Sequence, residues 1–385
     1  MRTIILAACA AAMLSLVASQ LLAQGTLGAQ GFGYPPGQFS TRALATGGGI
    51  SQFDPQSPVN PAAISASANP ALFLQYEPEF RTISSKDGDS QRAKLSRFPV
   101  AVAVLPVGSR ASLGLSVSTF LDRTWFTRTT RDETIAGETV TLTETARSTG
   151  AINDLRVAAG WAPKSWFQVG VGGHAMTGQN RVDFIQSFPD TTHFSAIAQR
   201  STLGYDGFAV SGGMVLRPHK SLVLAASGRK GGDIHARSGD TLVSTARIPD
   251  RLAAGLSFEG ISGASISGQV ARDLWSSMNG LGTDAARAVD AWDTGVGVEA
   301  LGPRIAERVV VLRIGGRYRT LPFLAAGEEV RELSFAAGIG AQFTRNRAAV
   351  DFAVQRSTRR TPSGGALDGV RERGLTLSFG LRVRP

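Results

Sequence analysis

The sequence predicts an all-β fold, a transmembrane antiparallel β-barrel of about 14 strands with an N-terminal hatch inside its lumen. Three observations support this prediction. From about residue 71 onward, apolar residues alternate with small or polar residues in one stretch after another. The connections between these stretches are alternately short and long. A Gly- and Pro-rich segment that still contains large apolar side chains precedes the first stretch.

Residues 1–23 are expected to be a secretory signal peptide. Arg2 forms a short basic region, Ile4 to Val17 form an apolar region, and Ser19 and Ala23 offer small residues for cleavage. The single cysteine lies inside this segment, so the exported chain would contain no disulfide. Beyond it no run of about 18 apolar residues occurs, so no membrane-spanning helix is expected.

Residues 24–69 are expected to form the hatch. The segment has no sustained periodicity and is rich in Gly, Pro, Ser and Ala. It also contains Phe39, Phe53 and Ile64, which a flexible linker would not need. We therefore expect an irregular segment that packs inside another part of the protein.

Residues 70–385 are expected to form the barrel. In the last stretch, GLTLSFGLRVRP, Leu375, Phe379 and Leu381 are on odd positions, whereas Thr376 and Ser378 are on even positions. Successive side chains of a strand point to opposite faces, so one face is apolar and the other small or polar. The same pattern predicts strands at 71–83, 96–106, 110–123, 150–162, 165–178, 201–217, 220–232, 248–259, 263–275, 290–301, 307–320, 332–344, 347–357 and 372–384.

The lengths of the connections indicate a barrel in an outer membrane. Connections after even-numbered strands are short, such as PVGSR and APKS, and those after odd-numbered strands are long, such as 124–149 and 179–200. Outer-membrane barrels have short periplasmic turns and long external loops. The apolar face would then contact lipid and the polar face would line the lumen. Such a lumen is too wide for small side chains to fill, which favours a plug made of the preceding segment.

The hatch contains motifs that resemble a known family. FSTRAL (Phe39 to Leu44), three glycines at 47–49, Asp54 and NPAAI (Asn60 to Ile64) resemble the hatch of the FadL-like outer-membrane transporters of long-chain fatty acids and other hydrophobic compounds. The resemblance implies a 14-stranded barrel that transports hydrophobic small molecules. It also implies an inward kink of the third strand that opens a side portal. Gly114 is the only glycine expected in that strand.

We expect hatch residues to bind ligand or to control its passage. The apolar candidates are Phe39, Phe53, Ala62 and Ile64, and Asn60-Pro61 would form a defined turn. An alternative is that Asn60-Pro61 only ends the hatch and begins the wall. A second Asn-Pro-Ala, within ANPALF (68–73), matches the family motif as well, but the spacing from Asp54 favours Asn60.

Residue patterns for catalysis or metal binding are absent from the sequence. The histidines are His174, His193, His219 and His235, with neither an HExxH motif nor a pair at ligand spacing, so we expect no metal, no cofactor and no enzyme activity. Only His174 falls inside an expected strand, where it would face the lumen. A hydrogen-bonded histidine is expected there, rather than a Ser-His-Asp hydrolase.

The net charge of +10 predicts an anionic partner. For an exported protein, lipopolysaccharide and other outer-membrane lipids are expected rather than nucleic acid. The cationic residues expected in external loops are Lys86, Arg92, Arg123, Arg128, Arg131, Arg359 and Arg360. The spacing of Glu372, Gly374, Leu377 and Phe379 resembles the strand recognised by the barrel-assembly machinery, which would be a partner during biogenesis.

Three functions remain open. The first is transport of hydrophobic small molecules, similar to long-chain fatty acids, across the outer membrane. The second is a scaffold or shuttle in protein secretion or surface attachment, as in related barrels. The third is a general porin, which the plug-like hatch disfavours.

Overall fold

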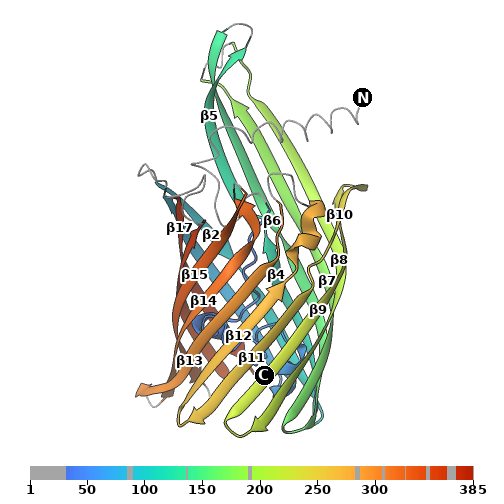
Figure 1. The fold of residues 1–385 in the computed structure, drawn as a ribbon, viewed down its shortest axis with the longest axis vertical. Helices are drawn as coiled ribbons and strands as arrows, with labels where there is room; N and C mark the ends of the chain where they lie inside the picture. Colours follow the sequence, from blue (N-terminus) through green and yellow to red (C-terminus); the bar gives the residue numbers. More distant parts are fainter. Residues whose placement is uncertain are drawn as a thin grey trace.

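In the computed structural model, neighbouring strands pair antiparallel around a closed ring, in which the first strand also pairs with the last (Figure 1). The structure describes residues 32–84, 90–135, 138–189, 193–281, 287–305, 308–325, 327–343, 347–361 and 370–384. The expected signal peptide, hatch residues 24–31 and Lys86 lie outside the described residues.

Seventeen strand segments make up the sheet. They are β1 (Ala71–Ser84), β2 (Ser90–Arg97), β3 (Val100–Val107), β4 (Ala111–Asp122), β5 (Trp125–Ile135), β6 (Glu138–Lys164), β7 (Phe167–Ser187), β8 (Ile197–His219), β9 (Leu222–Ser238), β10 (Thr241–Arg247), β11 (Arg251–Ile261), β12 (Ala264–Asp273), β13 (Ala291–Ile305), β14 (Arg308–Ala325), β15 (Glu328–Phe343), β16 (Ala348–Arg360) and β17 (Arg371–Val383). Three wall strands are each built from two segments, β2 with β3, β4 with β5, and β10 with β11. The ring therefore has 14 strands, and the predicted fold class is confirmed.

Alternating faces explain why these sequences form a barrel. In β17, Leu375, Phe379 and Leu381 are exposed on the outside, whereas Thr376 and Ser378 are buried on the inside. The same alternation recurs along the wall, and it gives the barrel an apolar outer belt and a mostly polar lumen. Closure of the ring leaves no free edge along most of the wall, which satisfies the backbone hydrogen bonds.

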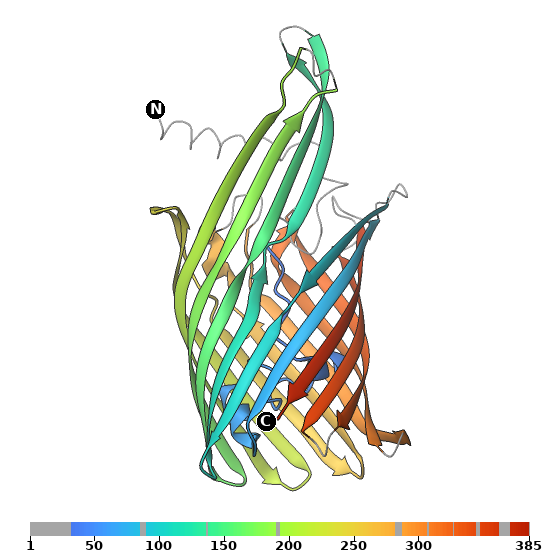
Figure 2. The same cartoon turned by 180° about the vertical axis from the view of Figure 1, so that it is seen from behind.

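The two ends of the barrel differ in the length of their connections, as the sequence predicted. The short connections lie at one end, called the turn end below, and the long ones at the other, called the loop end (Figures 1 and 2). The prediction that residues 124–149 and 179–200 form loops is wrong. The strands β5, β6, β7 and β8 continue through most of these residues and project past the rest of the wall. The stretch 124–149 is polar but rich in Thr, which favours extended backbone.

Within the described residues, helical structure is limited to short elements. The α-helix α2 (Thr41–Ala45) and the 3₁₀ helix η1 (Pro61–Ala66) lie inside the ring, and the 3₁₀ helix η2 (Trp275–Leu281) lies at the loop end. None of the helices in the described ranges is both long and apolar enough to cross a membrane.

Candidate functional site

Residues 32–67, called the lumen segment below, run inside the ring from the loop end towards the turn end (Figure 2). Local capping fixes its two helices. The Ser40 hydroxyl accepts from the Ala43 amide at 3.0 Å, and Asn60 Oδ1 accepts from the Ala62 amide at 3.0 Å. Asp54 then accepts from Ser40 Oγ. These bonds explain why a segment without periodicity takes one defined shape.

Glycines in the wall have no side chain, so the backbone of the lumen segment packs directly against the backbone of the wall. A methyl group at Gly295 would lie 2.1 Å from the Gly47 carbonyl oxygen, and one at Gly297 would lie 2.4 Å from the Thr46 carbonyl oxygen. A methyl group at Gly315 would lie 2.1 Å from the Thr46 carbonyl carbon. Any side chain at these wall positions would occupy the space of the turn at 46–47. The wall here is therefore shaped to the segment.

The second half of the lumen segment packs in the same way on β7 and β8. A methyl group at Gly170 would lie 2.5 Å from the Pro61 carbonyl carbon, and one at Gly213 would lie 2.0 Å from Asn60 Oδ1. Asn60 is fully buried, and its Nδ2 donates to the Gln52 carbonyl at 2.9 Å. Asn60-Pro61 is thus both the cap of η1 and the point where the segment contacts the wall.

The apolar residues proposed from the sequence for ligand binding lie apart from one another. Phe39 packs with Ala43 and Ile50, under the Arg317 guanidinium at 4.5 Å. Phe53 packs against the cluster that contains Ala62.

Ile64 lies in a third cluster, with Phe73 and the inward-facing valines of β3. The six proposed residues therefore take part in separate packing contacts, and the structure does not gather them around one cavity.

Charged side chains form a network around Tyr34, near the loop end of the lumen segment. The Tyr34 hydroxyl donates to Glu332 Oε2 at 3.0 Å, and the Arg359 guanidinium lies 4.4 Å from the Tyr34 ring centre. Arg359 pairs with Glu332 at 2.5 Å and with Glu79 at 3.0 Å. The network, called the Tyr34 network below, contains Tyr34, Glu79, Arg81, Arg97, Arg319, Glu332, Arg359 and Glu372.

Two arginines expected in external loops belong to the interior instead. Arg359 is 1% exposed on β16, because it shares the inward parity of Gln355 and Ser357. Arg123 is buried and donates to the Tyr205 hydroxyl at 2.8 Å. The prediction of loop positions for both was wrong. A count of strand parity that continued to the end of β16 would have placed Arg359 in the lumen.

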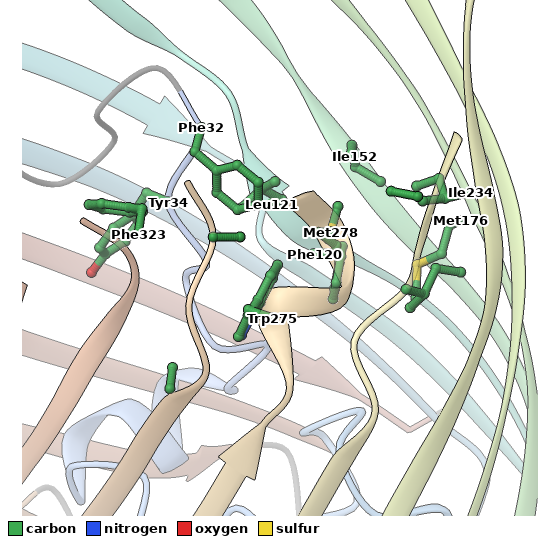
Figure 3. Packing of buried hydrophobic residues seen from close by; sticks show 14 of the residues in the cluster. Phe32, Tyr34, Phe120, Leu121, Ile152, Met176, Ile234, Trp275, Met278 and Phe323 are labelled. Carbon is green, nitrogen blue, oxygen red and sulfur yellow. The ribbon is translucent and has the colours of Figure 1, made fainter. Parts of the chain in front are cut away.

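A large apolar cluster fills the lumen at the loop end, between wall strands and η2 (Figure 3). Trp275 of η2 stacks on Phe120 with ring centres 5.1 Å apart, and Phe32 meets Trp275 edge-on at 6.2 Å. This apolar lumen cluster contains Phe32, Tyr34, Phe120, Leu121, Ile152, Met176, Tyr205, Ala209, Ile234, Ala236, Ala246, Ile248, Trp275, Met278, Ala288, Ala291, Leu321, Phe323, Ala325 and Val330. The sequence reasoning missed it, because it assumed a lumen lined by small and polar residues.

Beside Trp275 the cluster borders a small space lined by both polar and apolar side chains. Gln38, Arg229, Asp293 and Arg317 contribute to its lining, and its volume is about 40 Å³. A space of this size holds a few water molecules and excludes an alkyl chain or an aromatic ring. The apolar side chains beside it therefore pack on one another and would have to separate to admit an apolar molecule.

The wall opens beside this cluster. In the described residues β2 pairs with β1 only, and β5 pairs with β6 only, so no ladder joins β2 to β5. Figure 2 shows the two strands diverging towards the loop end. The divergence begins at breaks at 98–99 and 123–124, and Pro99 has no amide hydrogen to continue a ladder. The third wall strand, β4 with β5, is the one in which the family resemblance implied a kink. Its break at 123–124 lies well past Gly114, and Gly114 packs against Ile64.

The lumen segment forms the floor of this opening, called the wall notch below. Tyr34 and Asp122 exchange two backbone hydrogen bonds of 2.7 and 2.9 Å. Arg97, at the end of β2, pairs with the Asp122 carboxylate at 3.0 Å. The Tyr34 network therefore connects both sides of the notch to the lumen segment.

The lumen-facing position predicted for His174 is confirmed. Its side chain is buried and lies within hydrogen-bonding distance of Asp154 and Ser211. Across the described ranges no three His, Cys, Asp or Glu side chains gather in an arrangement that could hold a metal ion.

No protein-family model matches the sequence, and the search of curated proteins finds no relative. Solved structures do resemble the fold. A FadL homologue from Pseudomonas aeruginosa matches with a TM-score of 0.61 at 13% identity, over 91% of this chain and 99% of that chain. The Pseudomonas putida toluene transporter TodX matches with a TM-score of 0.54 at 12% identity, over 89% and 97% of the two chains. The monoaromatic hydrocarbon channel CymD matches with a TM-score of 0.53 at 14% identity, over 96% and 99%.

Proposed function

The fold is that of the FadL-like barrels, and from this premise we propose that the protein transports apolar small molecules across an outer membrane. The observation that carries the proposal is the apolar lumen cluster, which lies next to the wall notch and includes Phe32 and Tyr34 of the lumen segment. A water-filled pore would not need stacked aromatic rings in its lumen. Apolar molecules entering from the loop end would replace contacts between Trp275, Phe120 and Phe32 with contacts of their own.

The lumen segment would act as the hatch of this pathway. In this proposal the segment, which packs closely against Gly295, Gly297 and Gly315, would block straight passage to the turn end. The wall notch offers a sideways route from the apolar lumen cluster to the lipid around the barrel, as the resemblance to the FadL-like family implied. Long-chain fatty acids and aromatic hydrocarbons are the two ligand classes to test, since solved neighbours include a FadL homologue and a toluene transporter.

Trp275 provides the direct test. Burial of one large aromatic side chain contributes about 1.5–3 kcal/mol, so Trp275→Ala should weaken binding of a radiolabelled fatty acid or toluene roughly 10- to 100-fold. Phe335→Ala removes an aromatic ring from the outer belt, where Phe335 is 64% exposed, and should leave binding unchanged. Equal affinities for wild type and both variants would refute binding in the apolar lumen cluster.

Mass spectrometry of organic extracts from the detergent-purified protein gives a second test. Apolar molecules should co-purify with the wild type and decrease in a variant without residues 32–67. Clean extracts from both proteins, together with a protein partner that co-purifies stably, would instead support a scaffold or shuttle. The projecting ends of β5, β6, β7 and β8 offer the surface for such a partner.

The lipid partners expected from the sequence remain part of the proposal. The outer belt has the alternation that a bilayer requires, and the projecting strands carry exposed Arg147 and Arg181 on its loop-end side. Phosphates of lipopolysaccharide would bind such guanidinium groups. The C-terminal strand, with Phe379 exposed, would be recognised by the assembly machinery, although Glu372 of the same motif is buried in the Tyr34 network.

A further inference from the structure

Three lumen-facing side chains on consecutive strands form an unbroken row, with Asp154 on β6, His174 on β7 and Ser211 on β8. His174 Nδ1 lies 2.8 Å from Asp154 Oδ1, and His174 Nε2 lies 2.8 Å from Ser211 Oγ. Each step of the row is diagonal, because Arg156 is opposite His174 and Gly172 is opposite Ser211 in the ladders. Diagonal neighbours are within reach of such side chains.

The surroundings set the direction of the hydrogen bonds. Asp154 is 1% exposed, and Gln38 Nε2 of the lumen segment donates to its Oδ2 at 2.9 Å. A buried carboxylate at Nδ1 favours the tautomer with its proton on Nδ1, which leaves Nε2 free to accept the Ser211 proton. Ser211 is the least buried of the three, as an attacking group must be. The row therefore has the order and the polarity of a nucleophilic triad.

Arg156 adds a cation beside the serine. It is 2% exposed, and its Nε and Nη1 have no hydrogen-bond partner in the described part of the chain. A methyl group at Gly172 would lie 2.7 Å from Ser211 Oγ and 3.4 Å from Arg156 Cδ, so both side chains converge above this glycine. A buried cation without full hydrogen bonding is costly, and a bound oxyanion would relieve that cost.

Contrary to the expectation from the sequence, we propose that Ser211, His174 and Asp154 hydrolyse carboxylic esters in the lumen. Ser211 Oγ forms a bond to the ester carbonyl carbon, the bond from that carbon to the alcohol oxygen breaks, and the serine proton passes through His174 Nε2 to the leaving alcohol. Water then attacks the acyl group, its proton returns through His174, and the carboxylic acid leaves with Ser211 restored. Arg156 stabilises the negative oxygen in both steps.

The substrates are esters with an apolar part. Met176 lies two residues beyond His174 on β7, and Ala209 lies two residues from Ser211 on β8. Both belong to the apolar lumen cluster, which would hold the acyl or alcohol chain beside the triad. The proposal shares the lumen with transport but does not depend on it, since an ester that reaches Ser211 is cleaved whether or not anything crosses the barrel.

The test uses the full chain in detergent and a fluorophosphonate probe, with the adduct located by peptide mass spectrometry. One adduct is expected on Ser211 of the wild type, and p-nitrophenyl butyrate should be hydrolysed. His174→Gln should slow both reactions about a hundredfold or more, and Ser211→Ala should abolish the adduct. Ser267→Ala is the matched control, because Ser267 is a buried lumen serine whose hydroxyl, among the described residues, hydrogen-bonds to another serine, Ser257.

Two results would overturn the proposal. The first is wild-type protein with native strand content and no adduct on Ser211, which needs no variant to interpret. The second is labelling or hydrolysis at the same rate in His174→Gln, which would mean that the histidine does not act as the base. Binding of fatty acid or toluene, measured separately, decides the transport proposal without affecting this one.

Discussion

The contact between Gly295 and the lumen segment predicts that a single methyl group inside the wall will disturb the packing of that segment. In Gly295→Ala the new carbon would lie 2.1 Å from the Gly47 carbonyl oxygen, and an ordinary contact is 3.4 Å or longer. The turn at 46–47 would have to move by about 1.3 Å, although it is packed tightly against β13 and β14. Forcing extra volume into such a site costs about 1–3 kcal/mol.

Gly268→Ala is the matched control for this experiment. Gly268 is on the adjacent strand and faces outward, and a methyl group there would meet nothing nearer than the Gly295 carbonyl oxygen at 3.6 Å. Both substitutions reduce the backbone freedom of the unfolded chain equally. The difference between the two variants in the free energy of unfolding therefore reports the collision with the turn alone.

Two assays read out the result. Urea unfolding in lipid or detergent should show Gly295→Ala less stable than Gly268→Ala by about 1–3 kcal/mol. Planar-bilayer recordings should show more frequent ionic openings for Gly295→Ala, because a displaced turn no longer seals against the wall. If the two variants are indistinguishable in both assays, the backbone-to-backbone seal between the lumen segment and β13 does not exist.

Further predictions concern the Tyr34 network, the cap of η1 and the outer belt. Arg359→Met removes a cation that pairs with three buried carboxylates and should lower the free energy of unfolding by about 3–5 kcal/mol, whereas Arg360→Met, at the exposed neighbouring position, should change it by less than about 0.5 kcal/mol. Tyr34→Phe keeps the ring but removes the bond to Glu332, and urea unfolding should show a loss of about 1.5–3 kcal/mol. Asn60→Ala removes the cap of η1 and should cost about 0.5–2 kcal/mol by the same measurement; no loss would mean that the cap is dispensable. Val157→Arg places a charge on the outer belt and should lower the free energy of unfolding in bilayers by about 2–4 kcal/mol. The control Val157→Ile should change it little, and equal stabilities of the two variants would argue against lipid contact.

The sequence was sufficient for the architecture because a barrel repeats one simple pattern. Period-two alternation and the parity of connection lengths gave the 14 strands in their order. The lengths of β5 to β8 were not predicted, since polar and Thr-rich sequence suits both an exposed loop and a strand that projects beyond an apolar belt. Local composition does not separate these two cases, whereas cross-strand pairing does.

The interior was harder to predict than the wall. Parity placed His174 in the lumen, but its partners Asp154 and Ser211 follow from the register between strands, which the alternation leaves open. The Tyr34 network joins residues nearly 300 positions apart, such as Tyr34 and Glu332. Contacts of this kind depend on closure of the whole ring and leave no local signal in the sequence.

Closure of the ring by β1 and β17 has a consequence for the order of assembly. The lumen segment immediately precedes β1, yet its turn at 46–47 fits against β13 and β14, far round the wall. The backbone of this turn lies directly against the backbone of those strands. The segment therefore has little room to slide into a barrel that has already closed. We expect the segment to be in place before the last hydrogen bonds between β1 and β17 form, so that filling the lumen and sealing the wall are a single step.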